Sequence, residues 1–169
     1  MATGIRPQAA MVDYFLKIEG IEGESQDAKH KGEIHITSFS WGASNPGSHE
    51  AGGGGGAGKV LMQDFHFTAP VGKHSPKLML ACASGEHIKK AVLIARRAGK
   101  EQQEYLKYSF SDLLVSSFNI EGHDHEPVPK ETFSFNFATI EKEYKEQKSD
   151  GTLGGAVKAG WKRKENTKV

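Results

Sequence analysis

The sequence contains a single cysteine, Cys82, among its 169 residues, so no disulfide can form within the chain. Proteins without disulfides are typical of a reducing compartment, and we expect this one to assemble in the cytosol. The chain also lacks any apolar run long enough to span a membrane. Its N-terminus has one arginine but no apolar segment of the kind that a secretory signal peptide requires. If the protein leaves the cell, it therefore does so without such a signal.

The sequence also lacks an excess of either basic or acidic residues. The 22 basic residues nearly balance the 21 acidic ones, which gives a formal net charge of +1. Dedicated nucleic-acid binders usually carry a strong basic excess, so we expect no nucleic-acid partner. Hydrophobic residues make up 37% of the chain and charged residues 25%, which is ordinary for a globular protein. The length indicates one domain.

What the sequence has in excess is glycine, above all in "HEAGGGGGAGKV" (49–60). Gly53, Gly58 and Lys59 match the first part of a phosphate-binding loop, and the run also fits G-x-G-x-x-G. A true phosphate loop has a serine or threonine after the lysine and a helix behind it, whereas here Val60 begins a strand-like segment. The context favours a flexible loop over a nucleotide site.

Alternation of apolar residues predicts strands along most of the chain. We expect strands in 33–42, 60–67, 91–97, 104–110, 112–120 and 131–144, with the two apolar sides swapping within the first two. The last segment is the clearest, because Phe133, Phe135 and Phe137 share one face. The chain should turn back in a hairpin at residues 98–100, and we expect loops at 22–32, 121–130 and 145–155.

One helix is predicted in "HSPKLMLACASGEH" (74–87). Ser75 suits the N-cap, Pro76 the first turn and Gly85 a left-handed stop. Leu78, Met79 and Cys82 form an apolar stripe, so we interpret Cys82 as a core residue and not as a nucleophile. The fold class is mainly β with one short helix, in a barrel or a sandwich.

Candidate chemistry is sparse. His123, Asp124, His125 and Glu126 could bind a metal, but their spacing matches no closed tetrahedral set, so a solvated loop is favoured. No G-x-S-x-G motif is present. The basic C-terminal segment 158–168 is interpreted as a flexible, solvated tail, with an acidic partner surface as the alternative. We predict no catalytic residue, no metal and no cofactor, which points to a binding or structural role.

Several blocks in order resemble the Hcp (haemolysin-coregulated protein) family, whose members form the inner tube of the bacterial type VI secretion system. The blocks are "DYFLKIEGIEGES" (13–25), "SFSWG" (38–42), "GGGGGAGKVLMQDFHF" (52–67), "SPKLMLACASG" (75–85), "LLVSSF" (113–118), "FNFATIEKEY" (135–144) and "GGAVKAGW" (154–161). The resemblance runs from about Met11 to the C-terminus. It implies a single-domain β-barrel of two sheets with one helix beside it, similar to phage tail-tube proteins.

The resemblance also implies a function. Six copies would form a homohexameric ring, and rings would stack into a tube inside a contractile sheath, capped by a VgrG spike. Contraction would drive the tube into a neighbouring cell, and small effector proteins would travel in the lumen. The protein would assemble in the cytoplasm and be secreted by this machine. The alternative is an enzyme: a nucleotide hydrolase using Lys59, or a metal-dependent hydrolase using His123 and His125.

Two sets of residues are predicted to carry the tube function. Phe39 and Trp41 should face the core because they are large and apolar, which turns Ser38 and Ser40 toward the lumen and its effectors. The segment from Gly42 to Lys59 should be an arm that contacts a neighbouring subunit, since glycine allows close backbone approach. Its predicted contact residues are Gly42, Gly52, Gly53, Gly54, Gly55, Gly56, Gly58 and Lys59.

The ends of the chain depart from the family pattern. We interpret residues 1–10, "MATGIRPQAA", as a disordered leader that comes from an upstream start or from cloning, with the Hcp-like domain in 11–169. Because no long extension follows residue 161, we expect no fused toxin domain.

Overall fold

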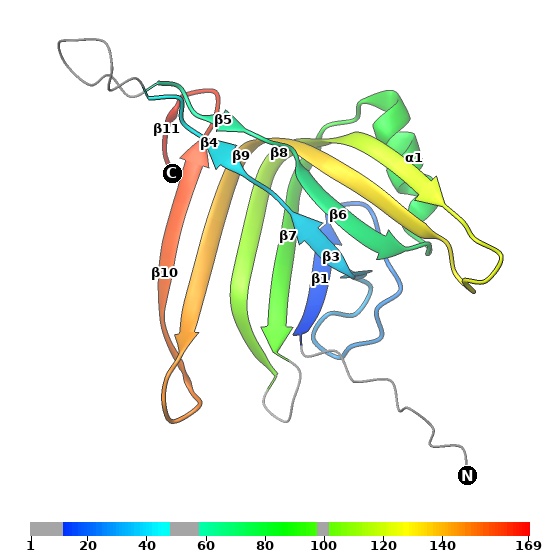
Figure 1. Cartoon of the computed structure of the whole chain (residues 1–169), viewed down its shortest axis with the longest axis horizontal. Coiled ribbons are helices and arrows are strands. Elements are labelled where there is room, and N and C mark those ends of the chain that lie inside the picture. The colour runs from blue at the N-terminus through cyan, green and yellow to red at the C-terminus, as the bar shows by residue number, and fades with distance from the viewer. Residues whose placement is uncertain (1–11, 48–57, 98–101) are drawn as a thin grey trace.

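The computed structural model describes residues 12–47, 58–97 and 102–169. These residues form eleven strands and one helix (Figure 1). The elements are β1 Val12–Ile18, β2 Ile34–Ile36, β3 Ser38–Ser40, β4 Ala43–Ser44, β5 Leu61–Met62, β6 Phe65–Pro70, α1 Ser75–Ser84, β7 Ile88–Arg97, β8 Gln103–Glu121, β9 Lys130–Gln147, β10 Leu153–Lys162 and β11 Thr167–Lys168.

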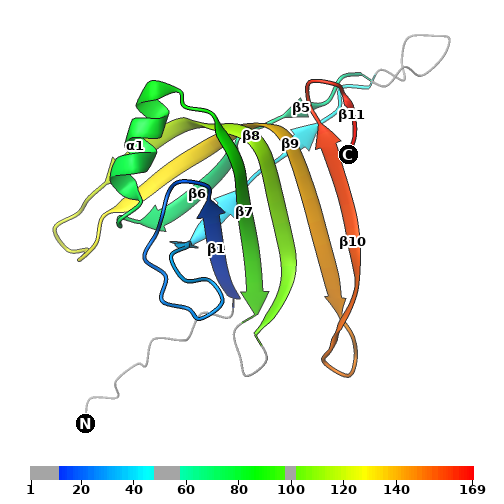
Figure 2. The same ribbon diagram turned by 180° about the vertical axis from the view of Figure 1, so that it is seen from behind.

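A nine-stranded antiparallel sheet dominates, in the order β11-β10-β9-β8-β7-β1-β2 (Figures 1 and 2). The sheet closes on itself because β6 pairs with the first half of β9 and with β3. Between β2 and β3, the Thr37 amide donates to Thr68 O of β6 at 2.9 Å. Residues 34–40 thus join the two sides of a barrel, and β4 and β5 form a separate two-stranded sheet. The predicted fold class, a mainly β single-domain barrel with one helix, is confirmed.

Aromatic rings fill the barrel. The predicted alternation of Phe133, Phe135 and Phe137 is confirmed, and all three side chains are buried. Phe67 of β6 and Phe110 of β8 meet them at centroid distances of 4.8 to 5.6 Å. Phe65 of β6 packs on Phe67 and Phe110, at 5.0 and 4.9 Å. Tilted and edge-on pairs of this kind add to the free energy of burying the rings. The core therefore fixes which face of β6, β8 and β9 points outward.

Several strand predictions need correction. Residues 104–110 and 112–120 are one strand, β8, and not two. The alternation breaks there because Asp112 takes a positive φ of 49° and the register shifts between Val115 and Ser117. Such bulges bend a long strand without ending it. The expected loop at 145–155 is shorter, since β9 runs to Gln147 and β10 begins at Leu153.

The C-terminal segment is ordered into strands. The prediction of a flexible tail over 158–168 is wrong where β10 pairs with β9 along residues 156–162 and β11 pairs with its end. The side chains of β10 are nevertheless mostly exposed, so the polarity of the segment was interpreted correctly. Residues 1–10 and the turn at 98–100 lie outside the described residues, although β7 and β8 do pair as a hairpin.

The helix is found where it was predicted, with two differences. Its N-cap is His74 and not Ser75, whose Oγ accepts the Gly72 amide at 3.0 Å. Gly85 ends the helix with a left-handed φ of 66°, as expected. The buried residues are Leu78 and Ala81, while Met79 is 57% exposed, so the predicted stripe is wrong at Met79.

Candidate functional site

The outward face of β3, β6, β9 and β8 carries small polar side chains in two registered rows. The upper row contains Ser40, His66, Ser134 and Ser117. The lower row contains Ser38, Thr68, Thr132 and Asn119. We call these eight residues the hydroxyl face. Six of the eight are serine or threonine. Ser134 is only 1% exposed and bonds to its neighbours on β8, so the other seven side chains offer the surface's hydrogen-bond donors and acceptors, with no fixed charge.

The core dictates this arrangement. Side chains alternate across a strand, and Phe39, Phe67 and Phe133 point into the barrel between the residues of the hydroxyl face. Ser38 and Ser40 are exposed, whereas Phe39 and Trp41 are partly buried against the core. The predicted orientation of these four side chains is therefore confirmed. That the exposed side lines a lumen remains a prediction.

Hydrogen bonds hold part of the hydroxyl face in place. The Ser134 hydroxyl lies 2.7 Å from that of Ser116 and 2.5 Å from that of Ser117. Beyond the upper row, Asn136 Nδ2 donates to Asp64 Oδ1 at 2.9 Å. These cross-strand contacts restrict rotamers at the bulge of β8. The surface is preorganised over β8 and β9.

Most of the hydroxyl face was missed from the sequence. His66, Thr68 and Thr132 carry no motif, and only their alternation with buried neighbours, as in "FHFTA" (65–69), marks them as outward. They lie beside Ser38 and Ser40 because strands that are far apart in the chain pair with one another. A single sequence does not report that pairing.

The predicted arm leaves the barrel as a two-stranded ribbon. Ala43 pairs with Met62, and Ser44 with Leu61, while the Gln63 amide donates to Gly42 O at 3.0 Å. Leu61 is 61% exposed although it is large and apolar. Figure 1 shows β4 and β5 reaching beyond β9 and β10. Gly42 and Lys59 thus lie at the two ends of the described part of the arm.

Among the predicted arm glycines, Gly58 has a visible reason to be glycine. A Cβ there would lie 2.9 Å from Pro46 O, closer than real Cβ contacts. At Gly42, a Cβ would meet only the end of the Gln63 side chain, at 3.4 Å. Gly52, Gly53, Gly54, Gly55 and Gly56 lie outside the described residues.

The residues considered for enzymatic roles do not come together into an active site in the part of the chain that the structure describes. Lys59 is exposed and precedes β5, where a phosphate loop would place a helix. In the 122–129 loop, His123 Nε2 lies 3.3 Å from Glu121 Oε1, and His125 Nδ1 lies 3.4 Å from the adjacent Asp124 Oδ1. Within residues 12–47, 58–97 and 102–169, no group of three or more His, Cys, Asp or Glu side chains is placed to hold a metal.

Two buried polar contacts could not be predicted from the sequence. His74 Nε2 bonds to Glu131 Oε1, which ties the start of α1 to β9, and their side chains are 5% and 0% exposed. Arg96 of β7 is 2% exposed and bonds to Asp27 and Asp13. Its hydrogen bonds to Asp27 hold the pKa of that carboxyl well below its ordinary value. Both contacts anchor loops to the barrel.

No helix in the described residues is suited to span a membrane. The helix found in the described residues, α1, is ten residues long, too short to cross a bilayer.

Comparison with known proteins gives one consistent answer. A family model described as "Type VI secretion system effector, Hcp" matches residues 15–144. Protein hcp1 of Pseudomonas aeruginosa is 45% identical over 160 residues, which cover 94% of this chain and 99% of that protein.

Solved structures agree. The crystal structure of Hcp1 from Salmonella typhimurium is 35% identical with a TM-score of 0.78, and the match covers 95% of this chain and 100% of that one. A structure described as a type six secretion system protein is 30% identical with a TM-score of 0.88, covering 93% and 99%. The likeness extends over nearly the whole length of each protein.

Proposed function

This chain belongs to the Hcp family and is a tube protein of the type VI secretion system, and from that premise we propose that six copies close into a ring whose lumen is lined by the hydroxyl face. Members of this family are secreted structural proteins and not enzymes. The observation that carries the proposal is the pair of registered polar rows on the outside of a phenylalanine core.

The chemistry of the hydroxyl face suits a cargo wall. Serine and threonine bond to a passing protein surface through donors or acceptors, since the hydroxyl rotates. Small side chains leave the channel wide, and the absence of fixed charge from the two rows avoids binding one sign of cargo too tightly. Small effector proteins would therefore be held by many weak contacts and released on delivery.

The remaining parts of the assembly follow from the same proposal. The ring is assembled in the cytoplasm, where the lone Cys82 stays reduced, and leaves through the type VI machine without a signal peptide. Stacked rings lie inside the contractile sheath, with the VgrG spike at the tip. The arm from Gly42 to Lys59 contacts a neighbouring subunit, within the ring or in the next ring; the exposed Leu61 supports this role.

One substitution tests the lumen assignment. Ser40→Gln adds bulk to the upper row without charge, so effector co-purification should fall while the ring stays intact by size-exclusion chromatography. The matched control is Ser149→Gln in the exposed β9–β10 turn, which should leave both unchanged. Unchanged cargo recovery with Ser40→Gln, in intact rings, would show that this face is not the cargo wall.

A further inference from the structure

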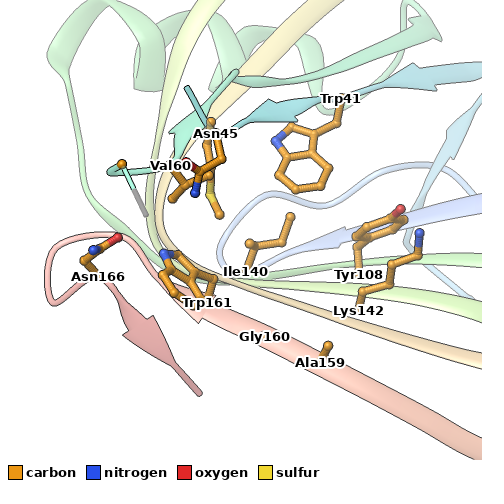
Figure 3. Close-up of a pocket in the computed structure, with 12 residues that line it drawn as sticks. Trp41, Asn45, Val60, Tyr108, Ile140, Lys142, Ala159, Gly160, Trp161 and Asn166 are labelled. Atoms are coloured by element: carbon orange, nitrogen blue, oxygen red, sulfur yellow. The ribbon is translucent and has the colours of Figure 1, made fainter. Parts of the chain in front are cut away.

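An apolar pocket opens between the base of the arm and the inner face of β8–β10 (Figure 3). Its volume is about 490 Å³. Trp41 and Met62 border it from the arm side, and Tyr108, Ile140 and Trp161 from the sheet. A pocket of this size and composition is typical of a binding site.

The polar groups that line the pocket differ in whether they already have a hydrogen-bond partner. Trp41 Nε1 already donates to Gln63 O at 3.0 Å. Trp161 Nε1, in contrast, is buried and has no hydrogen-bond acceptor in the part of the chain that the structure describes. The Lys142 ammonium lies 5.2 Å from the Tyr108 ring centroid, at the pocket wall. The pocket therefore presents apolar walls and one positive charge, and the Trp161 N–H is buried at its edge without an acceptor, which is costly.

The apolar surface continues beyond the pocket. Tyr144 of β9 is paired with Val157 of β10 on the same inner face, and their exposed fractions are 42% and 72%. This row lies next to the row that contains Tyr108, Lys142 and Ala159. The inner face of the sheet is thus uncovered where it extends past the barrel, which marks an interaction surface.

A complementary surface lies on α1. Leu78 and Ala81 pack on the barrel, but Met79 and Leu80 point outward and are 57% and 62% exposed. The last turn has no basic residue, and the exposed Glu86 follows the helix. The final carbonyls of a helix carry a partial negative charge and lack helical partners. This end of α1 therefore combines two apolar side chains with acceptors and negative charge.

The two surfaces cannot meet within one chain. Figures 1 and 2 both show α1 on one flank of the barrel and β5 and β10 on the other. Two different, complementary surfaces on opposite flanks are what a head-to-tail ring interface requires. We propose that Met79 and Leu80 of one subunit insert into the pocket of the next subunit. The C-terminal end of α1 then faces Lys142 and the Trp161 N–H. This inference rests on the proposed ring and names its subunit contact.

Disulfide cross-linking tests the contact. In a Cys82→Ser background, Met79→Cys is combined with Ala159→Cys, which lies at the pocket, or with Lys158→Cys, which is adjacent in the chain but on the opposite face of β10. Oxidised rings should give an intersubunit ladder with residue 159 and lose it with residue 158, because a disulfide needs Cβ atoms about 4 Å apart. If rings of verified mass cross-link equally at residues 159 and 158, or at neither, the proposed contact is wrong.

Tryptophan fluorescence gives an independent readout, since both tryptophans of the chain border the pocket. Assembly should shift their emission to shorter wavelength. Leu80→Glu should abolish that shift and weaken the ring, whereas Ile120→Glu, at a 59% exposed site outside the pocket, should preserve the shift. Normal rings and emission with Leu80→Glu, or a small apolar molecule retained in the pocket by native mass spectrometry, would contradict the inference while leaving the ring proposal standing. A native protein that stays monomeric would overturn both.

Discussion

The guanidinium of Arg96 binds the carboxylate of Asp27 through two hydrogen bonds, 3.0 Å from Nη1 to Oδ1 and 2.7 Å from Nη2 to Oδ2. Arg96 also lies over the Phe15 ring, with its Cζ 4.8 Å from the ring centroid. A planar, two-point contact of this kind is stronger than a single-point ion pair. It fastens the loop that follows β1 to strand β7, although the two residues are 69 positions apart.

We predict that Asp27→Asn lowers the thermal unfolding midpoint at neutral pH, because it removes a charge that Arg96 stabilises. The pKa of Asp27 in the folded protein is lowered, first by the hydrogen bonds from Arg96. The contribution of Asp27 is therefore fully present above the unfolded-state pKa of about 4 and declines as the pH falls below it. Melting curves of both proteins should converge in acid. The exposed Asp124→Asn is the control, and an equal gap at every pH would contradict the prediction.

The buried bond between His74 and Glu131 leads to a second prediction. Glu131→Ala leaves the His74 ring without its partner in the interior, which should cost about 2–3 kcal/mol of unfolding free energy. Glu131→Gln retains a hydrogen-bonding group and should cost less. Glu121→Ala, at a side chain that is 74% exposed, should change little. Urea unfolding at one protein concentration measures all three, and equal losses for Glu131 and Glu121 would show that burial does not matter here.

The arm provides a third prediction. The barrel core does not involve it, so removal of residues 52–58 should leave a folded protein with unchanged far-ultraviolet circular dichroism. Ring closure or ring stacking should weaken, since the ordered arm would have contacted a neighbour. Lys59→Ala tests the nucleotide-binding alternative. Like the native protein, it should stay at background in an ATP-binding assay.

Either of two results would refute this account of the arm. Assembly of the shortened protein at the native level would remove the proposed contact. Binding of ATP by the native protein, abolished by Lys59→Ala, would support the phosphate-loop alternative instead.

Local sequence patterns predict the fold well where the conformation of a residue depends on its neighbours in the chain. The alternation of Phe133, Phe135 and Phe137 located β9 and its buried face, and Gly85 marked the end of α1 because only a left-handed residue fits there. Strand β10 was missed because Gly154, Gly155 and mixed polar residues give no alternation, and its order comes from pairing with β9. Propensity is overridden in such a case by tertiary context.

The candidate site was predictable only in part, for the same reason. Ser38 and Ser40 were assigned outward from the neighbouring Phe39, a local argument. His66, Thr132 and the burial of Arg96 depend on partners between 26 and 83 positions away. Contacts over such separations are set by topology, and topology is not visible in the periodicity of a single sequence.

The proposed function depends on closure of this tube protein into a ring of six. Native mass spectrometry at micromolar concentration tests it most directly, with size-exclusion chromatography as support. We expect a dominant species at six times the 18.4 kDa chain mass. A head-to-tail interface is satisfied at every subunit only when the ring closes, so few intermediate species should appear. A protein that remains monomeric under these conditions would contradict the account.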